Sequence, residues 1–147
     1  MDYQELNLAR MAEKITDIRE ALEVLREYAS RPDSQFLGNK EAVWSARYAF
    51  ILMTEAAANI ASHVCAKLLA RAPRTYADSF LILGEAGLLD ADLASRLGKM
   101  VGFRNLLVHR YGDVDDARML RIMREDLDDV ELYLQGVARI LHKAKKR

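Results

Sequence analysis

The chain has 147 residues and no net charge, with 22 Lys and Arg against 22 Asp and Glu. This length suffices for one domain, and a content of 51% hydrophobic and 30% charged residues excludes a disordered or disulfide-built chain. Because no net positive field is available, any contact with nucleic acid must be local.

The N-terminus and the single cysteine indicate the compartment. Residues 1–5 lack the basic and then apolar pattern of a signal peptide, and the longest uncharged run, 56–66, falls short of the roughly 20 residues of a membrane span. Cys65 has no partner for an internal disulfide, so we expect a small buried side chain in a reducing environment. The sequence therefore predicts a cytoplasmic protein without membrane association.

The composition favours helices over strands. Ala and Leu supply 42 residues, whereas the β-branched Val, Ile and Thr supply 18. Pro32 and Pro73 each lie in a polar stretch where a helix would end. Apolar residues recur at alternating spacings of three and four near both ends of the chain. We expect an all-α, up-and-down antiparallel bundle of three long and about two shorter helices.

The first half of the chain contains two long helices and one short one in this interpretation. The first helix is expected near residues 5–29. The second spans about 40–70, is capped by Asn39 or a neighbour, and carries several alanines that let another helix approach closely. After Pro73, Thr75 opens a short helix that ends near Leu83.

The second half continues with two more helices. Asp90 is expected to cap a helix over about 93–111. A long last helix is expected over about 114–144, with Asp113 as its N-cap. The short basic tail at about 142–147 is interpreted as a frayed, solvated end, the alternative being a phosphate-binding arm.

Several enzyme classes have no support in the sequence. It contains no Gly-rich phosphate loop, no Cys or Cys/His spacing typical of metal sites, and no Gly-x-Ser-x-Gly elbow. Nucleotide hydrolysis, zinc chemistry and serine-hydrolase chemistry are therefore not expected, and neither a metal nor a cofactor is predicted. Because no internal repeat or linker appears, residues 1–147 are expected to form a single domain.

Residues 104–111 place four chemically active side chain types on an otherwise apolar helix. On a regular helix Asn105 and His109 share one face, while Arg104 and Tyr111 share an adjacent one. Arg104 and His109 diverge by roughly 140°, so they cannot easily grip one small group together. Either the helix is irregular here, or two subunits combine their sites around a twofold axis.

These residue types suit cleavage of an RNA phosphodiester. An imidazole such as His109 moves protons near neutral pH, and a guanidinium such as Arg104 clamps a phosphate and stabilises the charge of a phosphorane. RNA supplies its own nucleophile, the 2′-hydroxyl, and Asn105 would orient His109 or the ribose. Spacing alone also fits an arginine and a histidine on a solvent-exposed face with no catalytic role.

The pattern Arg-Asn-x3-His-x-Tyr in residues 104–111 resembles the signature of HEPN domains, and specifically their HepT-like branch. The resemblance covers roughly residues 10–135. It extends to residues outside the motif, namely Tyr76, Phe80 and Leu83 before a Gly-rich turn, Val114 and Asp115 after the motif, and Glu55, Asn59, Ile60 and His63 in the second helix.

This resemblance implies a homodimeric, metal-independent endoribonuclease in which the motifs of two protomers face one cleft. Arg104 and His109 match the family's catalytic residues, and Asn105 matches a supporting polar residue. Family members are commonly toxins encoded beside a minimal nucleotidyltransferase (MNT) antitoxin, which can attach AMP to the motif tyrosine; Tyr111 is the matching position. The implied partners are therefore an RNA substrate, an MNT antitoxin and a second copy of the chain.

Other residues allow more than one interpretation. Glu55, Asn59 and His63 follow at spacings of four and form either a second shell reaching toward the cleft or an interhelical network or dimer seam. Trp44 and Tyr48 are interpreted as core or interface residues, with base stacking as the alternative. The rival function is a non-catalytic helical module that binds and positions a nucleotidyltransferase.

Overall fold

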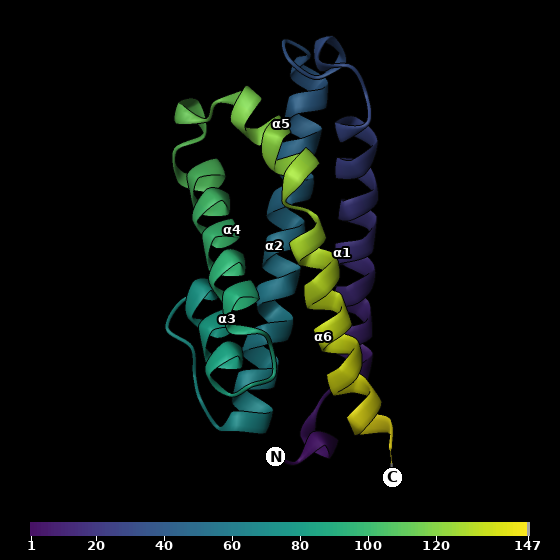
Figure 1. The fold of residues 1–147 in the computed structure, drawn as a ribbon, viewed down its shortest axis with the longest axis vertical. Coiled ribbons are helices and arrows are strands. Elements are labelled where there is room, and N and C mark those ends of the chain that lie inside the picture. Colours follow the sequence, from purple (N-terminus) through teal and green to yellow (C-terminus); the bar gives the residue numbers. More distant parts are fainter. Residues whose placement is uncertain (147) are drawn as a thin grey trace.

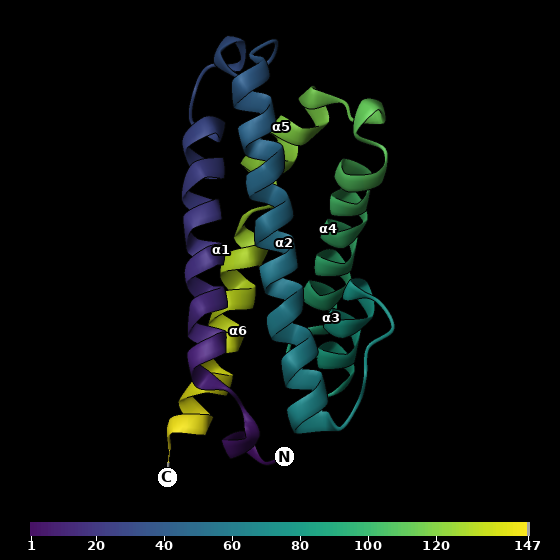
Figure 2. The ribbon, with the colours of Figure 1, turned by 180° about the vertical axis from the view of Figure 1, so that it is seen from behind.

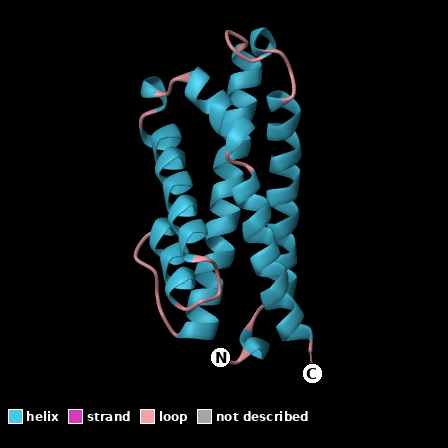
Figure 3. Cartoon of the chain, viewed as in Figure 1, coloured by secondary structure: helices cyan, strands magenta, loops and turns pink. Residues whose placement is uncertain are grey.

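The computed structural model describes residues 1–146, which form six α-helices and no strand. Figures 1 and 3 show the helices running up and down along one long axis. This confirms the expected all-α class. The helices are α1 (Leu8–Ala29), α2 (Lys40–Leu69), α3 (Tyr76–Glu85), α4 (Ala91–His109), α5 (Asp116–Glu125) and α6 (Asp128–Lys145).

Helix α2 forms the centre of the bundle. Viewed from behind, it lies between α1 and α4, and α6 covers its other side (Figure 2). A continuous stretch of 18 residues in α2 has a mean hydropathy of 1.3, so the helix is long and apolar enough to cross a membrane, but 61% of that stretch is buried inside the protein. We therefore interpret α2 as the core helix of the bundle, around which the other helices bury their apolar faces.

Short polar side chains fix where most helices begin. The side chains of five residues accept a backbone N–H from the first turn of the following helix, which satisfies one of its unpaired donors. Three of these caps, Asn39, Thr75 and Asp90, were expected from the sequence. The full set is Asn7, Asn39, Thr75, Asp90 and Asp115.

Two buried side chains connect the central helix to its neighbours. The Tyr133 hydroxyl on α6 donates to the Ala57 carbonyl of α2 at 2.7 Å, and its ring packs edge-on against Phe80 of α3. Cys65 is fully buried, as expected, and its thiol lies 3.4 Å from the Ser79 carbonyl. Burial raises the pKa of this thiol to about 11, so it stays protonated near neutral pH.

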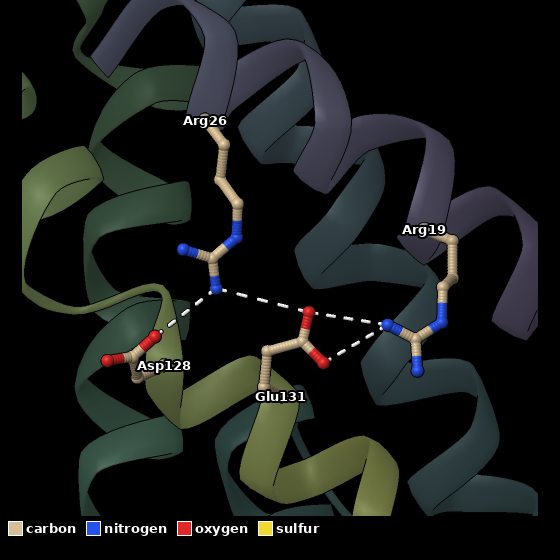
Figure 4. A network of polar contacts seen from close by, with 4 residues as sticks. All are labelled: Arg19, Arg26, Asp128 and Glu131. Atoms are coloured by element: carbon tan, nitrogen blue, oxygen red, sulfur yellow. Dashed lines mark hydrogen bonds and ion pairs between the residues drawn. The ribbon is translucent and has the colours of Figure 1, made fainter. Parts of the chain in front are cut away.

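Ion pairs fix the start of α6 against α1 (Figure 4). Arg19 Nη1 donates to both oxygens of Glu131 at 3.3 and 3.1 Å. Arg26 Nη2 donates to Asp128 Oδ1 at 3.3 Å and lies 3.9 Å from Glu131 Oε1. Such exposed pairs contribute only about 0–1 kcal/mol each, so they set the register of the two helices more than their stability.

The last helix was expected to be continuous over 114–144, and this expectation is wrong. The structure has α5 and α6, separated at Asp126 and Leu127, and the N-cap of α5 is Asp115 rather than Asp113. Three acidic residues occupy the first turn of α6, where their negative charges interact favourably with the positive end of the helix dipole and so stabilise a helix that begins here. The pattern of apolar residues did not indicate this break, because it continues through it: Met123, Leu127 and Val130 are all buried.

The ends of the chain also differ from expectation. The first helix begins at Leu8 rather than near residue 5, because Tyr3–Glu5 forms a separate 3₁₀ turn. The basic tail expected at about 142–147 is helical as far as Lys145, and its cations lie in the last turn of α6, where they oppose the negative end of the helix dipole. Arg147 lies outside the described residues.

His63 of α2 anchors the beginning of α1. Its Nε2 accepts a hydrogen bond from the Asn7 backbone N–H at 2.9 Å, which requires the neutral imidazole. Burial, followed by the charges of Arg10 and Lys67, lowers the pKa of His63 below its ordinary value of 6.5. The neutral form is thus favoured in the folded protein.

This shift predicts a pH-dependent contribution to stability. Because the folded-state pKa is lowered, the stabilisation is complete above the unfolded pKa and is lost as the pH falls from there through the folded pKa. We expect the free energy of unfolding, measured by denaturant titration, to decrease from about pH 7.5 to about pH 5.5 by a larger amount in the wild type than in His63→Gln. His142→Gln, at an exposed position of α6, serves as the control and should show the same decrease as the wild type. Equal decreases in the wild type and His63→Gln would contradict this role.

Candidate functional site

Arg104 lies where α4 meets α2 and α3. Its Nη2 donates to Glu55 Oε1 of α2 at 2.5 Å, and its Nη1 donates to Asn105 Oδ1 at 2.9 Å. The guanidinium carbon lies 5.2 Å from the centre of the Tyr76 ring, which belongs to the first residue of α3. Three helices therefore fix the position of one cation.

The Arg104 side chain is only 15% exposed. Its Nε is buried and has no hydrogen-bond partner within residues 1–146. Glu55 and Asn105 take one donor each from a group that has five, so the guanidinium keeps donors for an incoming anion. The carboxylate of Glu55 offsets the cost of burying the charge and holds the planar group in one orientation.

A groove of about 590 Å³ opens beside Arg104. Its wall from the α2–α3 connection carries Arg74, whose exposed side chain has no carboxylate partner within the described residues. Two cations thus face one open space, which suits a phosphodiester backbone. The lining residues are Ser62, Pro73, Arg74, Thr75, Tyr76, Ala77, Val101, Arg104 and Asn105.

His109 is the last residue of α4 and is exposed to solvent. The helix ends here because Arg110 leaves helical geometry, with φ −140° and ψ 44°. The expected helix over 93–111 is therefore wrong at its C-terminal end. Tyr111 lies instead in a 3₁₀ turn, Tyr111–Asp113, and is 69% exposed. The expectation that Arg104 and Tyr111 share a helix face is wrong for the same reason.

The three polar residues expected on one face of α2 have separate partners. Glu55 pairs with Arg104, so this residue does reach the candidate site. Asn59 donates from Nδ2 to the Glu55 carbonyl at 2.8 Å, one turn back along the same helix. His63 is bonded instead to the start of α1.

The aromatic residues Trp44 and Tyr48 are exposed, at 61% and 65%. They are therefore not core residues, and the interface and stacking interpretations are the ones left open. Leu52, at 39% exposure, continues the same line at a spacing of four. A groove of about 440 Å³ between α1 and α2 is lined by Tyr48, Leu52 and Glu55 among others, so this apolar face reaches the ion pair of Arg104.

The sequence did not identify Arg74 as part of the site, and it singled out Tyr76 only through the family resemblance. Both precede or begin α3, about 30 residues before Arg104, and no spacing rule connects them to the motif. Their position depends on how α3 packs on α4. That packing is close: a Cβ added to Gly84 of α3 would lie 2.8 Å from the Cβ of Ala94.

Sequence comparisons match nearly the whole chain. The family model described as "Ribonuclease HepT-like" matches residues 18–137. The tRNA nuclease HepT of Aphanizomenon flos-aquae is 31% identical over 86 residues, which is 58% of this chain and 58% of that protein, so the match spans less than two thirds of the relative. A putative RNase of Archaeoglobus fulgidus is 31% identical over 134 residues, covering 91% of this chain and 95% of its own.

The fold also matches a solved structure. The tri-AMPylated HEPN toxin of Shewanella oneidensis, solved in complex with an MNT antitoxin, superposes with a TM-score of 0.82 and 25% identity. The alignment covers 88% of this chain and 97% of the toxin. Together with the family match, this confirms the resemblance seen in the Arg-Asn-x3-His-x-Tyr motif: the chain belongs to the HepT-like family of HEPN proteins.

Proposed function

We propose that this protein is an endoribonuclease toxin of a HEPN/MNT toxin–antitoxin pair, acting in the cytoplasm as one HepT-like domain. The observation that carries the proposal is the Arg104 guanidinium, fixed by Glu55 and Asn105 beside an open groove, with His109 further along the same helix. The names of the relatives, a tRNA nuclease, a putative RNase and a HEPN toxin, support the same activity.

In this proposal the RNA supplies the nucleophile. The 2′-hydroxyl oxygen bonds to the adjacent phosphorus as its proton leaves, and the bond from phosphorus to the 5′-oxygen breaks. The products are a 2′,3′-cyclic phosphate and a 5′-hydroxyl that has gained a proton. His109 performs one of the two proton transfers, Arg104 stabilises the extra negative charge on the phosphorane, and Asn105 orients the site. No metal takes part in this mechanism.

A homodimer brings the two catalytic groups together. On α4 the side chains of Arg104 and His109 diverge by roughly 140°, so a single protomer does not direct both at one phosphate. Gly98, Gly102 and Asn105 precede His109 at spacings of four, three and four, and a Cβ at Gly102 would meet no atom within 4 Å. In the proposed dimer a second α4 packs against the open position at Gly102, so that Arg104 of one copy faces His109 of the other.

The proposed antitoxin acts on Tyr111. Its ring is largely exposed in the turn after α4, where an enzyme can reach the phenol. Transfer of AMP from ATP forms a bond between the tyrosine oxygen and phosphorus and releases pyrophosphate. The product carries a bulky anion two residues from His109, which would repel the RNA backbone.

Replacing His109 tests the catalytic part of the proposal. Purified His109→Ala should cleave RNA about 10²–10⁴-fold more slowly than the wild type while keeping its helix content. His142→Ala, which removes an exposed histidine from α6, should cleave at the wild-type rate.

We expect EDTA to leave the wild-type rate unchanged, and a rate that vanishes in EDTA would refute metal independence. If the folded wild type leaves RNA intact, the rival function as a non-catalytic partner of a nucleotidyltransferase is favoured instead.

Replacing Glu55 tests how Arg104 is held. Glu55→Ala frees the guanidinium, so we expect kcat to fall between about 10- and 100-fold with a smaller change in KM. Glu55→Gln keeps an oxygen acceptor and should recover much of the lost rate. Glu85→Ala breaks an exposed ion pair outside the site, in which Arg71 Nη1 lies 2.9 Å from Glu85 Oε2, and should leave kcat unchanged. The positioning role is wrong if Glu55→Ala cleaves as fast as the wild type.

The site of modification is tested by mass spectrometry. After incubation with ATP and the nucleotidyltransferase encoded beside this gene, the wild type should gain the mass of one or more AMP groups on Tyr111. Tyr111→Phe should gain none because it lacks the phenolic oxygen. Tyr48→Phe removes another well-exposed tyrosine and should still be modified. AMP found on Tyr111→Phe would place the acceptor elsewhere.

A further inference from the structure

Arg47 of α2 extends to the segment that follows α4. Its Nη1 donates to the Tyr111 carbonyl oxygen at 3.1 Å, and its Nη2 donates to Asp116 Oδ1 at 2.8 Å. The side chain is only 16% exposed, and its Nε is buried without a partner within residues 1–146. One guanidinium thus connects the central helix, the 3₁₀ turn and the first residue of α5.

The segment 110–114 has little else to hold it. Its other hydrogen bonds are local: Arg110 N to Leu106 O at the end of α4, Asp113 N to Arg110 O, Val114 N to Tyr111 O, and the pair of Arg110 with Asp113. Of the hydrogen bonds formed by residues 1–146, the one from Arg47 joins this segment to a different helix. Apart from it, the half-buried Val114 packs on the core.

We propose that Arg47 is a positioning residue of this enzyme: by binding the Tyr111 carbonyl and Asp116 together, it fixes the end of α4 and the orientation of His109 and Tyr111. This inference rests on the proposed nuclease function. A planar guanidinium presents two donors in a fixed fork, so it holds a carbonyl and a carboxylate at once. Because a small displacement of a catalytic group lowers the rate strongly, this connection matters for chemistry more than for folding.

The structure contains a matched control for this arrangement. Arg124 of α5 donates from Nε to the Ala29 carbonyl at 3.1 Å and from Nη2 to the Arg31 carbonyl at 3.0 Å. Its Nη1 also pairs with Asp33 at 2.7 Å. Arg124 therefore holds the connection between α1 and α2 with the same chemistry, but that connection contains none of the proposed catalytic residues.

The experiment compares Arg47→Met with Arg124→Met. Both lose an arginine that binds main-chain carbonyls, so we expect similar decreases in thermal stability. Arg47→Met should lower kcat for RNA cleavage by about tenfold or more, with KM within about twofold of the wild type, because the reacting group is displaced and the groove is intact. Arg124→Met should keep the wild-type kcat.

Amide hydrogen exchange provides a readout that does not depend on catalysis. The amides of Asp113 and Val114 should exchange faster in Arg47→Met than in Arg124→Met, because the turn loses its connection to α2. If Arg47→Met does not fold, Arg47→Lys replaces it. A lysine keeps the charge opposite Asp116, but its single head group does not hold both acceptors, so the same changes in exchange and kcat are expected.

Each result has a distinct meaning. An unchanged kcat or unchanged exchange in a folded Arg47 variant overturns the inference, and so does a change in KM alone, which would make Arg47 a substrate contact. If the wild type does not cleave RNA, the proposed function fails, and the role of Arg47 in positioning His109 for catalysis fails with it. The exchange rates then still decide whether Arg47 holds the segment in place.

Discussion

The geometry of the candidate site depends on the ion pair between Arg104 and Glu55. A half-buried guanidinium is costly unless a carboxylate accompanies it into the same environment, and Glu55 supplies that carboxylate from the middle of the core helix. The pair leaves the guanidinium rigid, with donors still available to the groove. A free surface arginine could form the same hydrogen bonds to a phosphate, but it would lose side-chain entropy on binding and so bind more weakly.

Helix α2 serves both the core and the site. The Tyr133 side chain of α6 reaches its backbone at Ala57, while Glu55 contacts α4 and His63 contacts the residue before α1. Glu55, near the middle of the helix, pairs with Arg104, the proposed catalytic arginine, and Arg47, about two turns earlier, donates to the carbonyl of Tyr111 in the turn after His109. Helix α2 therefore contacts both ends of residues 104–111, at Arg104 and at Tyr111. Contacts of this kind with a rigid helix keep a site preorganised.

The sequence predicted those features that local chemistry determines. Caps such as Asn39 and Asp90 act on the next turn of their own helix, so spacing alone reveals them. The break at Asp126 was missed because the buried stripe continues through it. The end of α4 at His109 was also missed, and the contact of Arg47 with the following turn, 62 residues from His109 in the chain, is beyond the reach of local spacing. Similarly, a spacing of four placed Glu55 and His63 on one face but could not show that α4 meets one and the start of α1 meets the other.

The central claim is that Arg104 of one protomer and His109 of another serve the same phosphodiester. It is tested most directly by mixing two inactive variants, Arg104→Ala and His109→Ala, after unfolding and refolding them together. If sites are shared, each mixed dimer contains one intact site, and equal mixing should restore about a quarter of the wild-type activity. A mixture that forms mixed dimers and stays as inactive as its parents would contradict the claim.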